Sequence, residues 1–130
     1  MVSGRSLHVL VVDDDPHMRE IAKIALELDA HTTVSTCDSG EDALVAAPRL
    51  KPDMILLDLM MPRVDGVATM KRLREHEALA AVPVVFCSAA VQEDEIQRLL
   101  ALGAADVIVK PFDFHNLRHL VRQIWEKSRG

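Results

Sequence analysis

Five short apolar runs alternate with helix-type patterns along this chain, and this alternation restricts its fold more than any other feature. The runs cover residues 7–12, 32–37, 54–57, 84–87 and 107–109. Strands that are apolar throughout are typical of a parallel sheet with helices on both faces. Right-handed crossovers then favour a doubly wound, flavodoxin-like α/β fold with five strands in the order 2-1-3-4-5 and five helices.

Apolar spacing and helix-breaking residues predict the limits of the helices. The first helix is expected to begin at Pro16 and to bury one of its faces. The residues of that face are Met18, Ile21, Ala22, Ala25 and Leu28. The second helix is expected over Ser39–Ala47, ended by Pro48, and the third from about Val64 to His76. Gly103 is expected to end the fourth in a left-handed conformation.

Polar and charged side chains stand at the ends of four of the five predicted strands. Asp13 and Asp14 follow the first strand, Asp58 follows the third, Ser88 ends the fourth and Lys110 follows the fifth. In a doubly wound sheet the carboxyl ends of the strands form the functional crevice. We therefore expect carboxylates, one hydroxyl and one ammonium to face a common pocket.

The predicted cluster of carboxylates favours a bound cation. Two bare carboxylates about 4 Å apart repel by roughly 4 kcal/mol at an effective dielectric constant of 20. Either their pKa values rise or a cation binds between them. Oxygen ligands of this kind suit Mg²⁺. A single strand-end aspartate is often only a helix cap, so the prediction depends on the whole set.

The same residues provide what phosphoryl transfer requires. The Asp58 carboxylate is a possible nucleophile toward phosphorus. A metal ion and Lys110 could neutralise the phosphoryl oxygens, and the Ser88 hydroxyl could donate a hydrogen bond to one of them.

Four sequence motifs resemble those of bacterial response-regulator receivers, the phosphoacceptor domains of two-component systems. They are VVDDDP, LLDLMMPRVDG, VPVVFCSA and GAADVIVKPF. Each motif alone is weak, but the four occur in the family's order and spacing. The resemblance extends from about Leu7 to Trp125, which is nearly the whole chain.

The resemblance implies a metal site and a phosphoacceptor. Asp13, Asp14, Asp58 and the backbone carbonyl of Met60 would hold Mg²⁺. Asp58 would accept a phosphoryl group from a histidine kinase or a histidine phosphotransfer protein. The domain would then change conformation and regulate a downstream protein or an output domain. Asp15 is expected to cap or flank the first helix and not to bind the metal.

The resemblance also assigns residues at the fourth and fifth strands. Ser88 matches the switch hydroxyl and Lys110 the phosphate-pairing lysine, while Pro111 occupies a position where the family often has a cis peptide bond. Val107 departs from the pattern, because the family usually carries Tyr or Phe three residues before the lysine. A coupled hydroxyl–aromatic switch is therefore not expected, and output is expected to pass through the Ser88 loop and the fourth helix.

The neighbours of the phosphorylation site suggest a long-lived phosphoryl group. Met60 and Ala90 stand two residues beyond Asp58 and Ser88, and both are apolar. Neither can orient a water molecule for hydrolysis, so we expect a lifetime of minutes or longer.

Three other functions compete with this interpretation. A haloacid-dehalogenase-like phosphatase could use Asp13 and Asp15, but it needs a small hydroxyl residue where this chain has His17. In a flavodoxin, the three aspartates after the first strand would repel the flavin phosphate. A receiver-like module that docks without being phosphorylated stays open as the third alternative, and Val107 leaves room for it.

Composition bounds the partners and the compartment. The 130 residues predict a single domain, 1–130, and the net charge of −5 without a Lys/Arg run argues against direct nucleic-acid binding. No apolar run has the length of a membrane span and no secretory signal is evident, so a cytoplasmic protein is expected. Cys37 and Cys87 lack CxxC spacing and are expected to be small buried hydrophobic residues. We expect a monomer or a phosphorylation-dependent dimer.

Overall fold

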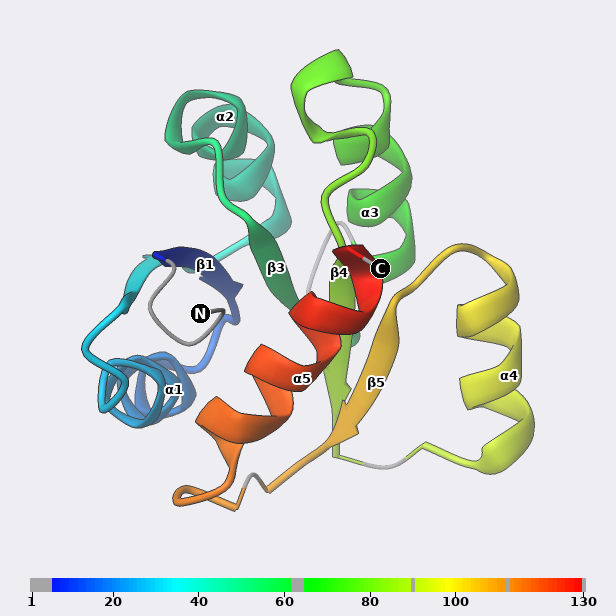
Figure 1. Ribbon diagram of the computed structural model, residues 1–130. Coiled ribbons are helices and arrows are strands. Elements are labelled where there is room, and N and C mark those ends of the chain that lie inside the picture. Colours follow the sequence, from blue (N-terminus) through cyan, green and yellow to red (C-terminus); the bar gives the residue numbers. More distant parts are fainter. Residues whose placement is uncertain (1–5, 62–64, 90, 112, 130) are drawn as a thin grey trace.

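A five-stranded parallel sheet forms the centre of the described part of the chain (Figure 1). The structure is a computed structural model that describes residues 6–61, 65–89, 91–111 and 113–129. The strands are Leu7–Val12 (β1), Thr32–Cys37 (β2), Met54–Asp58 (β3), Val84–Ser88 (β4) and Asp106–Val109 (β5). Their order is β2-β1-β3-β4-β5, so the predicted doubly wound topology is confirmed.

Among the described residues, five α-helices and one short 3-10 helix alternate with or follow the strands. The helices are Pro16–Leu26 (α1), Gly40–Leu50 (α2), Gly66–Arg74 (α3), Glu77–Leu79 (η2, the 3-10 helix), Glu93–Ala101 (α4) and Leu117–Arg129 (α5). Within these ranges no helix is both long and apolar enough to cross a lipid bilayer.

The two faces of the sheet carry separate hydrophobic cores because successive side chains of a strand point to opposite sides. In β1, Val9 and Val11 belong to the core under α1 and α5, whereas Leu10 and Val12 belong to the core under α2, α3 and α4. Figure 1 shows α1 and α5 side by side over one face. This explains why the strands are apolar throughout. Both cysteines are buried and unpaired, as expected.

The prediction that Pro48 ends the second helix is wrong, because α2 continues to Leu50. Proline has no N–H to donate to the carbonyl of Leu44, so α2 lacks one helical hydrogen bond at Pro48 and yet continues for two residues. The N–H of Lys51 donates to the carbonyl of Ala47 at 2.9 Å and closes that turn. Lys51 itself takes a left-handed conformation (φ 52°). Ser39, expected as the first helical residue, is instead the N-cap.

The predicted buried face of the first helix is partly wrong. Ala22, Ala25 and Leu26 are buried, whereas Ile21 is 39% and Leu28 48% exposed. Two of the three buried residues, Ala22 and Ala25, are small. Ile21 flanks that face, and Leu28 lies beyond the end of the helix.

The third helix differs from prediction at its ends, whereas the prediction for the end of the fourth helix is confirmed. The expected helix over 64–76 is Gly66–Arg74, capped by the Asp65 side chain. Its expected start, Val64, lies outside the described residues. Gly103 has φ 112°, so the predicted left-handed glycine after the fourth helix is confirmed.

Candidate functional site

Strand register brings the predicted site residues to the same edge of the sheet. Val12 pairs with Leu57, so Asp13 follows β1 at the level of Asp58, the last residue of β3. Asp58 in turn pairs with Cys87, directly before Ser88. Ser88 pairs with Val109, directly before Lys110, whose N–H donates to the Ser88 carbonyl at 2.8 Å. The Lys110–Pro111 peptide bond is cis.

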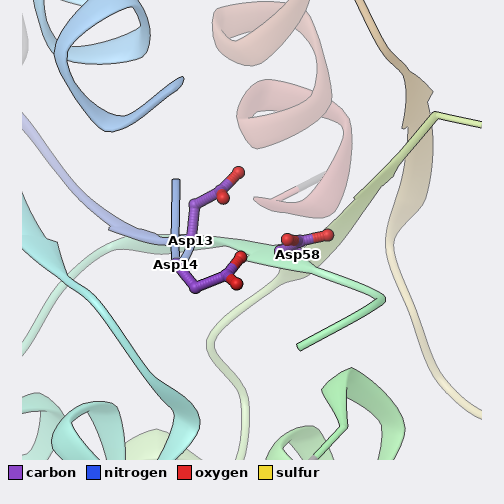
Figure 2. A group of neighbouring side chains, drawn as sticks. All are labelled: Asp13, Asp14 and Asp58. Carbon is purple, nitrogen blue, oxygen red and sulfur yellow. The ribbon is translucent and has the colours of Figure 1, made fainter. Parts of the chain in front are cut away.

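Three carboxylates gather at this edge (Figure 2). One oxygen from each of Asp13, Asp14 and Asp58 lies within 4.8 Å of the others. Asp13 and Asp58 are buried, while Asp14 is exposed, so the group opens to solvent on one side. Carboxylates so close together need positive charge nearby.

Lys110 provides one positive charge. Its Nζ lies 2.8 Å from Oδ2 of Asp13 and 3.6 Å from Oδ1 of Asp58. Partial burial alone would lower the pKa of this ammonium, but the hydrogen bond to Asp13 and the charges of both carboxylates raise it overall. Lys110 therefore stays protonated between the carboxylates of Asp13 and Asp58.

One lysine does not balance the cluster. Burial, followed by the charge of Asp13, raises the pKa of Asp58 from 3.8 to about 6. Lys110 and the N–H of Met60, which donates to Oδ1 of Asp58 at 3.2 Å, act in the opposite direction. A further cation would offset the remaining repulsion and keep Asp58 ionised.

The donor set fits Mg²⁺. Mg²⁺ takes oxygen ligands and usually binds one or two carboxylates while keeping several waters. Two buried carboxylates and one exposed carboxylate provide this combination at a site that water can reach. Met60 follows Asp58 closely in the chain, and its side chain is 74% exposed. Its predicted role, through the backbone carbonyl, stays a prediction.

In the turn after β1, the side chains of Asp13 and Asp15 have different hydrogen-bond partners. The N–H of Asp15 donates to Oδ1 of Asp13 at 2.9 Å. The Asp15 carboxylate instead accepts the N–H of His17 at 2.9 Å and caps α1. Asp15 is thus a helix cap, as expected, and is engaged away from the cluster. This contact counts against a phosphatase that would use Asp13 and Asp15 together.

Two residues at the site were not found from the sequence. Arg19 donates through Nη1 to the backbone carbonyl of Asp13 at 2.8 Å. Gly66 brings α3 against the end of β3, where an added Cβ would lie 2.7 Å from the carbonyl oxygen of Asp58 and 2.9 Å from the Cα of Leu59. Two sequence signals could have indicated these residues. Arg19 stands one helical turn after the cap residue Asp15, and Gly66 is the first residue of α3.

A family profile described as the response regulator receiver domain matches residues 9–122. The chain belongs to this family. Curated relatives support the assignment of this receiver domain. The probable C4-dicarboxylate response regulator DctR of Halalkalibacterium halodurans is 36% identical over 124 residues, covering 95% of this chain and 53% of that protein. The DNA-binding dual master transcriptional regulator RpaA of Synechocystis sp. is 36% identical over 121 residues, which cover 92% of this chain and 49% of that protein.

Solved structures agree with the fold of the receiver domain. The chemotaxis response regulator CheY4 of Vibrio cholerae has a TM-score of 0.84 and 28% identity, covering 92% of this chain and 98% of that one. A putative response regulator from Chloroflexus aurantiacus has a TM-score of 0.84 and 29% identity, covering 94% and 99%. The chain spans about half the length of the curated relatives it matches.

Proposed function

We propose that this receiver domain accepts a phosphoryl group on Asp58 in a Mg²⁺-dependent reaction. The donor is a histidine kinase or a histidine phosphotransfer protein. One observation carries the proposal: the Asp58 carboxylate lies within reach of both the Asp13–Asp14 pair and the Lys110 ammonium. Nucleophile, metal ligands and a fixed positive charge are thus combined at one sheet edge.

The chemistry assigned to Asp58 is a displacement at phosphorus. A carboxylate oxygen forms a bond to phosphorus while the bond to the donor's imidazole nitrogen breaks, and the imidazole leaves with the electron pair and takes up a proton. Oδ1 of Asp58 is held by the N–H of Met60 and faces Lys110, so we assign the attack to Oδ2. Lys110 neutralises charge on the phosphoryl oxygens.

Mg²⁺ would be held by Asp13, Asp14, Asp58 and the backbone carbonyl of Met60. When bound, it supplies charge stabilisation at the phosphoryl oxygens and allows Asp58 to remain ionised. The raised pKa of Asp58 supports this role, since an ionised carboxylate is the nucleophile.

Ser88 and β5 would convert phosphorylation into a conformational change. Ser88 ends β4 beside Asp58 in the register and is connected through its carbonyl to the N–H of Lys110. Its hydroxyl would move toward the phosphoryl group, and the loop between β4 and α4 would follow. Val107 packs partly against the core under α2, α3 and α4 and carries no ring, so this response needs no aromatic rotamer.

The proposed output is the control of another protein or of an output domain, with the receiver acting as a monomer or a phosphorylation-dependent dimer. Two of the relatives are named as a response regulator and a DNA-binding transcriptional regulator, and both are about twice as long as this chain. The net charge of −5 does not favour nucleic-acid binding by these residues themselves.

Intact-mass measurement after incubation with acetyl phosphate tests the proposal. The wild-type chain should gain the mass of one phosphoryl group in Mg²⁺ and none in EDTA, and Asp58→Asn should gain none. No gain by the folded wild type in Mg²⁺ would instead favour a module that docks without being phosphorylated.

A further inference from the structure

Arg19 connects α1 to the acidic turn although it belongs to none of the motifs that define the site. It lies in the second turn of α1 and is partly buried. Its Nη1 donates to the backbone carbonyl oxygen of Asp13 at 2.8 Å. A guanidinium is always protonated, so this is a charge-assisted hydrogen bond.

The remaining polar groups of Asp13 are also engaged. Its N–H donates to the carbonyl of Cys37 at 3.1 Å. Its Oδ1 accepts from the N–H of Asp15 at 2.9 Å, and its Oδ2 accepts from Lys110 at 2.8 Å. These contacts fix the nitrogen and the side chain of Asp13, and the bond from Arg19 fixes its carbonyl.

The Asp13 carbonyl determines the direction in which Asp14 leaves the strand. The carbonyl of Asp13 and the N–H of Asp14 belong to one planar peptide unit. Holding the oxygen therefore limits rotation of that plane and so limits where the exposed Asp14 carboxylate can lie relative to Asp13. The buried Asp13 and the partly buried Arg19 thus restrain the exposed Asp14.

We propose that Arg19 is a positioning residue that holds Asp13 and Asp14 as a pair for a divalent cation. This inference rests on the proposed function, because it assigns Arg19 to the Mg²⁺ affinity of the same site. Arg19 touches neither the phosphoryl group nor the reacting oxygen. Its loss should therefore weaken cation binding and leave the phosphorylated state reachable at high Mg²⁺.

Thermal unfolding as a function of Mg²⁺, without any phosphodonor, tests this directly. Mg²⁺ that binds only the folded protein raises its melting temperature, and the concentration for half of the effect reports the affinity. Arg19→Ala should need about tenfold more Mg²⁺, as expected when a residue that orients a metal ligand is removed. Arg19→Lys keeps a charged donor and should fall between Arg19→Ala and the wild type.

Arg49→Ala is the matched control. Arg49 comes from α2 and lines the same surface pocket as Arg19, so its removal takes one positive charge from that pocket while leaving the bond between Arg19 and Asp13. Arg49→Ala should reach half of the stabilising effect at the same Mg²⁺ concentration as the wild type. An Arg19→Ala chain that needs Mg²⁺ within about twofold of the wild-type concentration would overturn the inference.

Phosphorylation by acetyl phosphate separates positioning from chemistry. At saturating Mg²⁺, Arg19→Ala should reach the wild-type phosphorylation rate, and a rate that stays tenfold or more below it would overturn the positioning role. If Arg19→Ala does not fold, Arg19→Lys carries both tests, and a wild-type Mg²⁺ dependence would then overturn the inference. A wild type that shows no Mg²⁺-dependent stabilisation would instead refute the proposed function, and this inference with it.

Discussion

Replacing Asp58 with asparagine should stabilise the metal-free protein at neutral pH, although it removes the proposed phosphoacceptor. Asparagine has nearly the same shape and keeps an oxygen that can accept the N–H of Met60, which now lies 3.2 Å from Oδ1 of Asp58. Lys110 keeps its closer partner, Asp13, at 2.8 Å. The main change is therefore the loss of one buried negative charge.

The pKa of Asp58 sets the size and the sign of the effect. Burial and the neighbouring Asp13 raise this pKa from 3.8 to about 6. The folded protein then binds a proton more tightly than the unfolded chain, so wild-type stability falls as the pH rises from about 4 to about 6. The difference between the two pKa values corresponds to about 3 kcal/mol above that range. Asp58→Asn has no carboxyl group at this position, so its stability does not fall in this way as the pH rises.

Urea unfolding in EDTA, followed by circular dichroism between pH 4 and 8, measures the difference. Asp58→Asn should be about 2–3 kcal/mol more stable than the wild type at pH 8 and nearly equal to it at pH 4. The control Asp94→Asn, which removes an exposed carboxylate from the first turn of α4, should change stability by no more than about 0.5 kcal/mol. An Asp58→Asn protein no more stable than the wild type at pH 8 would refute the electrostatic reasoning.

Three further predictions concern packing, an ion pair and the phosphoryl lifetime. Gly66→Ala should lower the free energy of unfolding by about 1–3 kcal/mol, because the atoms that the new methyl would meet include backbone of the Asp58 strand end; unchanged urea unfolding would contradict this. Burial of Asp29 opposes its ionisation, but hydrogen bonds from Arg122 (2.7 Å) and its neighbours lower its pKa overall. Asp29→Asn should thus cost roughly 1–2 kcal/mol at pH 7, a loss that shrinks as the pH falls below about 4 and the carboxylate is protonated; a pH-independent loss would count against the ion pair. The wild-type phosphoryl group should last minutes or longer after donor removal, and Met60→Asn should shorten that time; a wild-type half-life of seconds would contradict the role of Met60.

Sequence was sufficient for the topology and for the gathering of the site residues because both depend on strand ends. Apolar runs locate strands, and the parallel order places every carboxyl end at one edge. Asp13, Asp58 and Lys110 therefore could be brought together without coordinates. Ser88 follows from the same argument. Its predicted position at the end of the fourth strand is confirmed, since β4 is Val84–Ser88.

The features that sequence did not predict depend on tertiary contacts. A proline such as Pro48 normally ends a helix, but α2 continues past it to Leu50 and closes with the hydrogen bond from Lys51 to Ala47. Helical periodicity predicts Ile21 on the buried face, but its actual exposure of 39% depends on tertiary packing that the periodicity does not show. Ala90, one of the two residues invoked for the phosphoryl lifetime, lies outside the described residues.

The contact made by Arg19 could not be predicted from the sequence for a different reason. Its partner is a backbone carbonyl, and a backbone group has no signature in the sequence. Helical periodicity places Arg19 on α1. It does not show that the Arg19 side chain reaches the backbone carbonyl of Asp13 at the end of β1. Only the structure connects it with the acidic pair.

The position of the phosphoryl group on the chain shows whether Asp58 is the phosphoacceptor. The wild type is phosphorylated with acetyl phosphate and Mg²⁺, treated with borohydride, which reduces an aspartyl phosphate to homoserine, and mapped by peptide mass spectrometry. We expect homoserine at position 58 and at no other aspartate, and none when Mg²⁺ is replaced by EDTA. Homoserine at Asp13 or Asp14, or a phosphoryl group that appears equally without Mg²⁺, would contradict it.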